Sequence, residues 1–538
     1  MSRPSQTPRS LATQAFALLA LSGATLASSG CSDAEFAGHF EQASNSGLDS
    51  GSASDSGGDE STTSDDPTET EAGGDPGGDP TGGEGGEDDD PYPEGAEESV
   101  FVLGQCDPAA DQLINYDLQQ AQVELAPALV RESVLNGPGA VPLIPLSAQP
   151  FLNHFEFNYE PAEGADPQIS GELWKPPMAN ADAPSRYRLQ FAIRGPEVLA
   201  EQRGPVDLAI VVDLGPSMSG EPLELAEEAL AALEAALVPG DRVTLIGADE
   251  MPSVIGESTM IDNFGITPLT GLLGEQDPAS KGDVAGGLAL AYETIEAPWD
   301  GQGQARVLLI SNGNFKVDDA LVGLVEDQAI NGHYLVSLGL GAPELFADAS
   351  LRELAAEGRG PLLYASSADD LWAQMQTRFA AHMLAAAIEL EINLTLPPGL
   401  SIRDRDQLAP KLEQPKLALL GPNDAIVIHH ELESCGELAE DAVVSVAIEW
   451  VDPIANIAKQ ALWQRSVADL GYGSMDTLKG AAAVAYARSL RGYRDGKPSD
   501  ESYGPVLDAI SLIAAALEAQ PDDADLLEMS QVLGKLED

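Results

Sequence analysis

Apolar strands alternate with amphipathic helices over residues 206 to about 380. Each short apolar run is followed by a segment whose apolar residues recur with the helical period. The predicted strands are 206–212, 242–247, 306–310, 334–338 and 361–364, and the predicted helices are 222–237, 284–297, 318–330, 344–357 and 368–386. This alternation predicts an α/β fold with a doubly wound, mostly parallel sheet.

After the last of these helices the apolar positions recur every second residue. Residues 389–396, 425–433 and 442–451 follow this pattern, which predicts antiparallel strands with one solvated face. We expect them to form a β-sandwich with an alternating strand at 186–193, just before the α/β segment. Helices are predicted at 111–135, 476–494, 502–519 and 523–536.

These patterns divide the chain into six segments. A length of 538 residues favours two or three folded domains. We predict a signal peptide (1–31), an acidic disordered linker (32–98), an N-terminal flanking region of helix and strands (99–203), the α/β domain (204–386), the β-sandwich (387–470) and C-terminal helices (471–538).

The first 31 residues are typical of an export signal. Arg3 and Arg9 precede an apolar run, Leu11–Ala27, and small residues lead to Cys31. The run is short and contains Thr, Gln and Ser, which disfavours a membrane-spanning helix. The segment Ala27-Ser-Ser-Gly-Cys31 resembles a bacterial lipobox, and this resemblance implies cleavage before Cys31 and lipidation of its thiol. We therefore expect a membrane-anchored lipoprotein of the bacterial cell envelope, with simple secretion as the alternative.

Two further cysteines, Cys106 and Cys435, remain after Cys31. In an oxidising compartment a pair of thiols can form a disulfide. Their Cα atoms must then lie within about 7 Å of each other. Two free thiols are the alternative.

The chain is strongly acidic, with a formal charge of −61 from 88 acidic and 27 basic residues. Such a charge repels nucleic acid and anionic lipid headgroups, so neither is expected as a partner. Residues 32–98 hold 21 of the acids and no Lys or Arg. This segment is predicted to be a disordered tether, because it cannot bury enough apolar surface to offset its ordering entropy.

Polar side chains follow the strand 206–212. Asp213, Ser217 and Ser219 come at its carboxyl end, where open α/β sheets bind ligands. Oxygen ligands of this kind suit hard cations such as Mg²⁺. The segment Val206–Gly220 resembles the start of a von Willebrand factor type A (VWA) domain, whose metal-ion-dependent adhesion site opens with Asp-x-Ser-x-Ser.

The resemblance implies a metal site built from three loops, and this chain departs from the pattern in each loop. Asp213 and Ser217 match the first loop, but Gly215 replaces its first Ser. In the second loop, Ser280–Asp283, Gly282 replaces a Thr and Asp283 stands where Asn is common. In the third loop, Leu308–Phe315, two amides replace two acids: Asn312 and Asn314.

We therefore predict a degenerate site. Its candidate metal ligands are Asp213, Ser217, Asp283 and Asn312, and the surrounding binding loops include Gly215, Ser219, Gly282 and Asn314. Tight binding of Mg²⁺ or another divalent cation is not expected, because such ions depend on anionic oxygens. On an alternative interpretation, Asp213 and Ser217 hydrogen-bond the loop and cap the helix beginning at residue 222.

The resemblance extends beyond this site. Segments such as Ser337–Gly341 and Gly358–Tyr364 resemble the YfbK-like group of bacterial VWA proteins, over about residues 110–536. This resemblance implies an exported or lipid-anchored protein whose relatives are binding or scaffold proteins.

Catalysis is not expected. The stretch from Gly215 to Ser219 lacks the second glycine of a hydrolase elbow. The pair His429-His430 is adjacent on a predicted strand, so the two rings point to opposite faces. No nucleophile, base and orienting group are assembled by the motifs, and no small-molecule substrate is inferred.

The sequence as a whole predicts a protein-binding or adhesion protein with an unknown partner. The predicted contact loops are 213–220, 280–283 and 312–314. The alternatives are a structural envelope protein that uses the VWA domain as a rigid scaffold, an Mg²⁺-dependent adhesion module with a residual metal site, and a metal-dependent hydrolase.

Overall fold

The computed structural model describes residues 109–116, 125–162, 164–176, 185–262, 268–295, 303–403, 418–439, 441–469, 471, 473–494, 498 and 503–537. The chain divides into two units, Met1–Asp89 and Asp90–Asp538, and every described residue belongs to the second. The predicted signal peptide, the acidic linker, Cys31 and Cys106 lie outside the described residues. Within these residues, no helix has the length and apolar character needed to cross a membrane.

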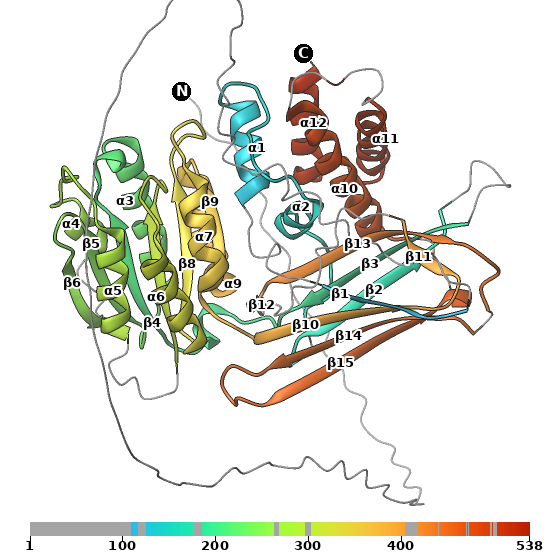
Figure 1. Ribbon diagram of the computed structural model, residues 1–538, viewed down its shortest axis with the longest axis horizontal. Helices are drawn as coiled ribbons and strands as arrows, with labels where there is room; N and C mark the ends of the chain where they lie inside the picture. The colour runs from blue at the N-terminus through green and yellow to red at the C-terminus, as the bar shows by residue number, and fades with distance from the viewer. Residues whose placement is uncertain are drawn as a thin grey trace, which may run out of the picture. The chain divides into compact units, whose positions relative to one another are not determined.

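A six-stranded sheet forms the centre of the α/β part (Figure 1). Its strands, in spatial order, are β6 (Ser253–Met260), β5 (Arg242–Ala248), β4 (Val206–Asp213), β7 (Gln304–Ser311), β8 (Tyr334–Leu340) and β9 (Arg359–Ala365). All neighbouring pairs are parallel except β5–β6, which is antiparallel. The predicted doubly wound, mostly parallel sheet is confirmed, with β6 as an additional edge strand that the sequence pattern did not predict.

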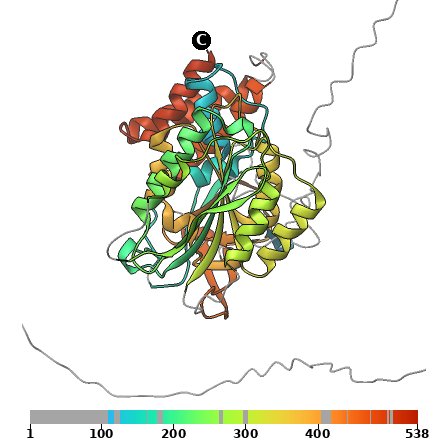
Figure 2. The ribbon, with the colours of Figure 1, turned by 90° about the vertical axis from the view of Figure 1, so that its left-hand side faces the viewer.

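Helices cover both faces of this sheet (Figure 2). One face packs against α3 (Glu221–Ala236), α4 (Leu269–Leu273), α8 (Ala368–Trp372) and α9 (Phe379–Met383), and the other against α5 (Val284–Ile295), α6 (Asp319–Ile330) and α7 (Asp348–Gly358). Alternate residues of β4 serve the two cores: Leu208 and Ile210 face the first, and Ala209 and Val211 face the second. This two-sided burial explains why the strands are continuous apolar runs.

The prediction of one helix over 368–386 is wrong. A π-helical turn, Ala373–Thr377, separates α8 from α9. The buried residues here, Leu371, Met375, Phe379 and Met383, recur every four positions. An α-helix with 3.6 residues per turn would rotate such residues away from the sheet, and one wider turn keeps them on the same face.

Two antiparallel sheets form the predicted β-sandwich. One contains β1 (Gln112–Asn115), β10 (Ala387–Leu396), β14 (Val443–Val451), β15 (Ala458–Ser466) and the short β12 (Ala418–Leu420); the other contains β11 (Leu400–Ile402), β13 (Ala425–Ser434), β3 (Arg186–Arg194) and β2 (Gln168–Trp174). Their facing side chains, including Phe191, Leu394 and Val446, form a common core. Strand β3 pairs with β13, which follows it by more than 200 residues, and this confirms the prediction that strands on both sides of the α/β segment form one sandwich.

The helix predicted over 111–135 is wrong in its first part. Residues Gln112–Asn115 form β1, which pairs with β10, and the helix α1 spans only Leu125–Leu135. Only Ile114 of β1 is fully buried. Pairing with a long neighbouring strand outweighed local helix preference there, as tertiary context often does.

The C-terminal helices predicted from the sequence are confirmed as α10 (Met475–Arg494), α11 (Gly504–Ala519) and α12 (Ala524–Glu537). They pack with α1 and α2 (Ala148–His154) in the same apolar cluster that covers one face of the α/β sheet. Arg131 of α1 joins the parts by ion pairs, 2.7 Å from Asp370 of α8 and 3.8 Å from Glu528 of α12.

Cys435, the residue after β13, is disulfide-bonded. The other two cysteines of the chain, Cys31 and Cys106, both lie outside the described residues.

Candidate functional site

The candidate site lies at the carboxyl ends of β4 and β7, which are neighbours in the sheet. Asp213, the last residue of β4, is buried, with 2% of its surface exposed. One of its carboxylate oxygens accepts the backbone N–H of Gly215 at 2.8 Å, and the other accepts the hydroxyl of Ser311 at 2.7 Å. Both oxygens of the first predicted ligand are therefore engaged inside the protein.

Burial raises the pKa of the Asp213 carboxyl above its ordinary value. The hydrogen bonds from Gly215 and Ser311 act in the opposite direction, because they favour the charged form, but the effect of burial is larger. The carboxylate is thus held by two short-range donors in surroundings that solvate charge poorly.

Two glycines bring the first and second loops into direct backbone contact. A Cβ atom placed on Gly282 would lie 2.9 Å from the Cα of Gly215 and 2.9 Å from a carboxylate oxygen of Asp213. A Cβ on Gly215 would lie 3.0 Å from the same oxygen. The Thr that the VWA pattern expects at position 282 therefore has no space unless the loops separate.

The third loop is fastened to the first by the side chain of Asn312. Its amide group donates to the carbonyl of Ser217 at 2.9 Å, and its amide oxygen accepts the hydroxyl of Ser217 at 3.1 Å. The same oxygen accepts the backbone N–H of Asn314, also at 3.1 Å. An aspartate could not donate to the Ser217 carbonyl, so the asparagine has a structural role that a metal ligand would not need.

Asp283 and Ser219 have other surroundings. A carboxylate oxygen of Asp283 accepts the backbone N–H of Gly286 at 3.0 Å, which is the geometry of an N-terminal cap on α5. Ser219 is exposed to solvent.

The alternative prediction is confirmed in one part and wrong in the other: Asp213 and Ser217 hydrogen-bond the loops, but they do not cap the helix that begins near residue 222. Helix α3 begins at Glu221 after Gly220, whose φ is 81°, and no side chain caps it. Asp213 and Ser217 are instead bonded to Gly215, Ser311 and Asn312. Pro222 does occupy the first turn, as predicted.

The residues at this edge do not fit a tightly bound divalent cation. Such an ion needs several oxygen ligands with enough negative charge. At the junction of the first and third loops, both oxygens of the Asp213 carboxylate are occupied by protein donors. Within the described ranges, no three His, Cys, Asp or Glu side chains cluster in a way that could hold a metal ion.

Sequence reasoning overlooked two residues of this junction, Ser311 and Met218. The sulfur of Met218 accepts the backbone N–H of Asn312 at 3.3 Å, beside the Ser311–Asp213 bond. The position of Ser311 beside Asp213 follows from the register of the two neighbouring strands. Val212 of β4 pairs with Ile310 of β7, so the next residues, Asp213 and Ser311, are neighbours.

Exposed apolar side chains stand on two other loops of the same edge. Met251 follows β5 and is 80% exposed, and Leu345 follows β8 and is 62% exposed. Three strand spacings separate β5 from β8, or about 14 Å. The hydrogen-bonded loops after β4 and β7 lie between them in the strand order.

His429 and His430 are buried on opposite faces of β13, His430 toward the sandwich core and His429 toward the helices, so the pair forms no metal site. Nδ1 of His429 lies 2.8 Å from Oε1 of Gln190, and Nε2 of His430 lies 2.7 Å from the hydroxyl of Tyr116. Burial lowers the pKa of His430 to about 3. Burial also lowers the pKa of His429 well below its ordinary value, so both rings are neutral packing groups.

No protein-family model matches the chain. No curated protein matches it either. Among solved structures, it is similar to a von Willebrand factor type A protein from Catenulispora acidiphila, with 15% identity, 68% of this chain and 90% of that chain covered, and a TM-score of 0.44. The ArnB paralog VWA2 from Sulfolobus acidocaldarius gives 14% identity, coverages of 69% and 98%, and a TM-score of 0.39.

The conserved hypothetical protein BatB from Bacteroides thetaiotaomicron is 19% identical, with coverages of 32% and 95% and a TM-score of 0.28. All three TM-scores are below 0.5, and the fold is defined by the order and directions of its own strands.

Proposed function

We propose that this protein is an exported, lipid-anchored VWA-domain protein that binds a protein partner through the loops at the carboxyl edge of its α/β sheet, without a metal ion. The supporting observation is that the polar groups where the loops meet are hydrogen-bonded to one another. Asp213 and Asn312 form hydrogen bonds with Gly215, Ser311 and Ser217. The side chains of Met251 and Leu345, on the adjacent loops, are exposed to solvent.

Such an edge suits protein recognition. Full burial of a Met or Leu side chain contributes about 1.5–3 kcal/mol. Hydrogen bonds hold together the loops after β4 and β7, and the N–H of Ala347 in the loop after β8 donates to the carbonyl of Asn312 at 2.9 Å, so a partner would need to order little of this part of the surface on binding.

Export and anchoring rest on the signal-like N-terminus and the lipobox-like Ala27–Cys31 segment. The disulfide at Cys435 is consistent with an oxidising compartment, where such bonds persist. Mass spectrometry of the mature protein tests this part, and an unmodified Cys31 or a retained signal segment would contradict it.

Affinity capture with the full-length chain from its native envelope tests the binding site. We expect the same captured protein with EDTA and with Mg²⁺, and a loss of at least tenfold when Met251→Glu and Leu345→Glu are combined. Leu462→Glu is the matched control, since Leu462 is also 62% exposed but lies on β15 of the sandwich. Capture that requires a divalent cation, or that survives the double substitution unchanged, would overturn the proposal.

A structural scaffold is the second candidate function. It is favoured by the ion pairs of Arg131, which tie the C-terminal helices to the α/β part through Asp370 and Glu528. On this account the partner contacts the sandwich or the helices. Loss of capture with Leu462→Glu, and not with the loop variants, would support it.

A further inference from the structure

Strand β6 is an edge strand of the α/β sheet. Within the described residues it pairs with β5 alone. Its eight residues contain a single charged side chain, Glu257, and no proline. Natural proteins usually protect an exposed edge with lysines, prolines or a covering element, so a weakly protected edge indicates a place where another chain can pair.

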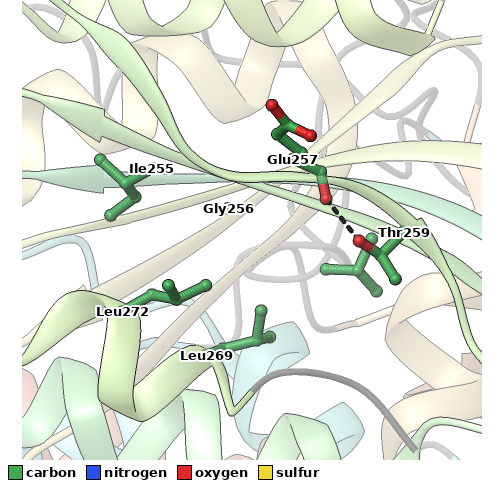
Figure 3. Close-up of a pocket in the computed structure, with 7 residues that line it drawn as sticks. Ile255, Gly256, Glu257, Thr259, Leu269 and Leu272 are labelled. Atoms are coloured by element: carbon green, nitrogen blue, oxygen red, sulfur yellow. Dashed lines mark hydrogen bonds between the residues drawn. The ribbon is translucent and has the colours of Figure 1, made fainter.

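A cavity of about 240 Å³ opens beside this edge, between β6 and α4 (Figure 3). Its apolar wall combines Ile255 of β6 with Leu269 and Leu272 of α4. Figure 3 shows the Glu257 carboxylate directed away from these leucines, while its carbonyl accepts the Thr259 hydroxyl at 2.7 Å. A cavity of this size and lining suits an aliphatic side chain.

Further apolar groups on β6 remain in solvent. Val254 is 37% exposed and Met260 is 63% exposed. Two register shifts between β5 and β6 interrupt the regular ladder, so backbone pairing with another chain would be limited to short stretches. The cavity would therefore hold one side chain of the partner, and backbone pairing would set the direction of the added strand.

The surroundings of the cavity are acidic. Residues 242–280, which include β5, β6 and α4, contain six acidic residues and one basic residue, Arg242, which is paired with Asp207. Helix α3, which packs against α4 in the same cluster, carries five glutamates and no basic residue. A second copy of this chain would bring the same acids to the edge, with a net charge of −61 on each copy, so it is a poor occupant.

We propose that β6 and its cavity form a docking site, separate from the loops at the carboxyl edge, for an extended basic segment of another protein. The segment adds to β6 as a strand. One of its aliphatic side chains enters the cavity, and Lys or Arg residues next to it lie near Glu257. This division follows from the two-residue repeat of a strand, which sends neighbouring side chains to opposite faces.

Three blocked peptides test the proposal with the full-length protein at about 0.15 M salt, where the Debye length is about 8 Å. Fluorescence anisotropy compares Lys-Val-Lys-Ile-Lys-Val-Lys with the same sequence in which Glu replaces Lys, and with one in which Ser replaces Val and Ile. We expect the first peptide to bind at least tenfold more tightly than either of the others. Equal binding of the Ser peptide would show attraction by charge alone and would overturn the proposal, as would no binding of the first peptide.

Two variants locate the site. Thr259→Trp places a large ring at the cavity, and Glu257→Lys reverses its charge; both positions are exposed, so the fold should tolerate them. Each should weaken binding of the first peptide at least fivefold. The matched control is Gln460→Trp on β15, an edge strand of the sandwich, which should leave binding unchanged. If the control weakens binding and the two β6 variants do not, the peptide binds elsewhere and the assignment to β6 is wrong.

Discussion

Replacing Asp213 with alanine should destabilise the protein with or without divalent cations. The substitution removes the acceptor for two buried donors, the N–H of Gly215 at 2.8 Å and the hydroxyl of Ser311 at 2.7 Å. An unsatisfied buried donor costs about 1–3 kcal/mol, so the two together cost about 2–6 kcal/mol. Removal of a poorly solvated charge offsets part of this loss. We therefore expect the free energy of unfolding to fall by about 2–4 kcal/mol.

Asp213→Asn provides the matched comparison. The asparagine oxygen can still accept from Gly215, and its amide group can donate to the Ser311 hydroxyl, which is able to accept. The expected loss is therefore less than about 1.5 kcal/mol, the net value of one hydrogen bond. Urea unfolding of the full-length wild type and both variants, each in EDTA and in Mg²⁺, measures these differences.

The stability of the wild type relative to Asp213→Asn also depends on pH. Burial raises the folded-state pKa of Asp213 above the ordinary value of 3.8, so the folded protein binds this proton more tightly than the unfolded chain. The stability of the wild type relative to Asp213→Asn should therefore decrease as the pH rises above about 3.8. Equal damage from Ala and Asn, or an Ala variant as stable as the wild type in EDTA, would refute the hydrogen-bonding account.

Three further predictions, with four substitutions, test separate parts of the structure. Gly282→Ala should cost about 1–3 kcal/mol by overpacking against Gly215, whereas Gly323→Ala, with nothing within 4 Å of its Cβ, should be neutral or stabilising; urea unfolding of both compares them. Burial raises the pKa of Glu528 to about 7 from 4.5, so the wild type should lose stability between these pH values, and Glu528→Gln should remove that loss in unfolding measured at pH 5 and pH 8. Cys435→Ser should lower the free energy of unfolding by about 2–4 kcal/mol relative to the oxidised wild type and by much less relative to the reduced wild type.

The periodicity of apolar residues predicted the strands and helices whose burial is regular. It did not predict β6, because Ser253–Met260 contains Gly256 and two register shifts and does not alternate cleanly. It also did not predict the π turn after α8, which depends on keeping Leu371 and Met375 against the sheet. Features set by packing between distant segments leave little trace in a local pattern.

For the candidate site, sequence position predicted which loops meet, because strands of a parallel sheet end at one edge. It could not predict what the substituted residues do once they meet. The contact between Gly215 and Gly282, and the two-way bond between Asn312 and Ser217, join residues 67 and 95 positions apart in the chain. Gly215, Gly282 and Asn312 depart from the metal-binding pattern, and in the structure these residues hold the loops together.

Isothermal titration calorimetry of the full-length protein with Mg²⁺, Mn²⁺ and Ca²⁺ tests the central claim most directly. The account predicts no saturable heat with any of the three cations, and identical traces for the wild type and Asp213→Ala after correction for dilution. Saturable heat in the wild type that disappears in Asp213→Ala would contradict the account and show that the carboxyl edge is a working metal site.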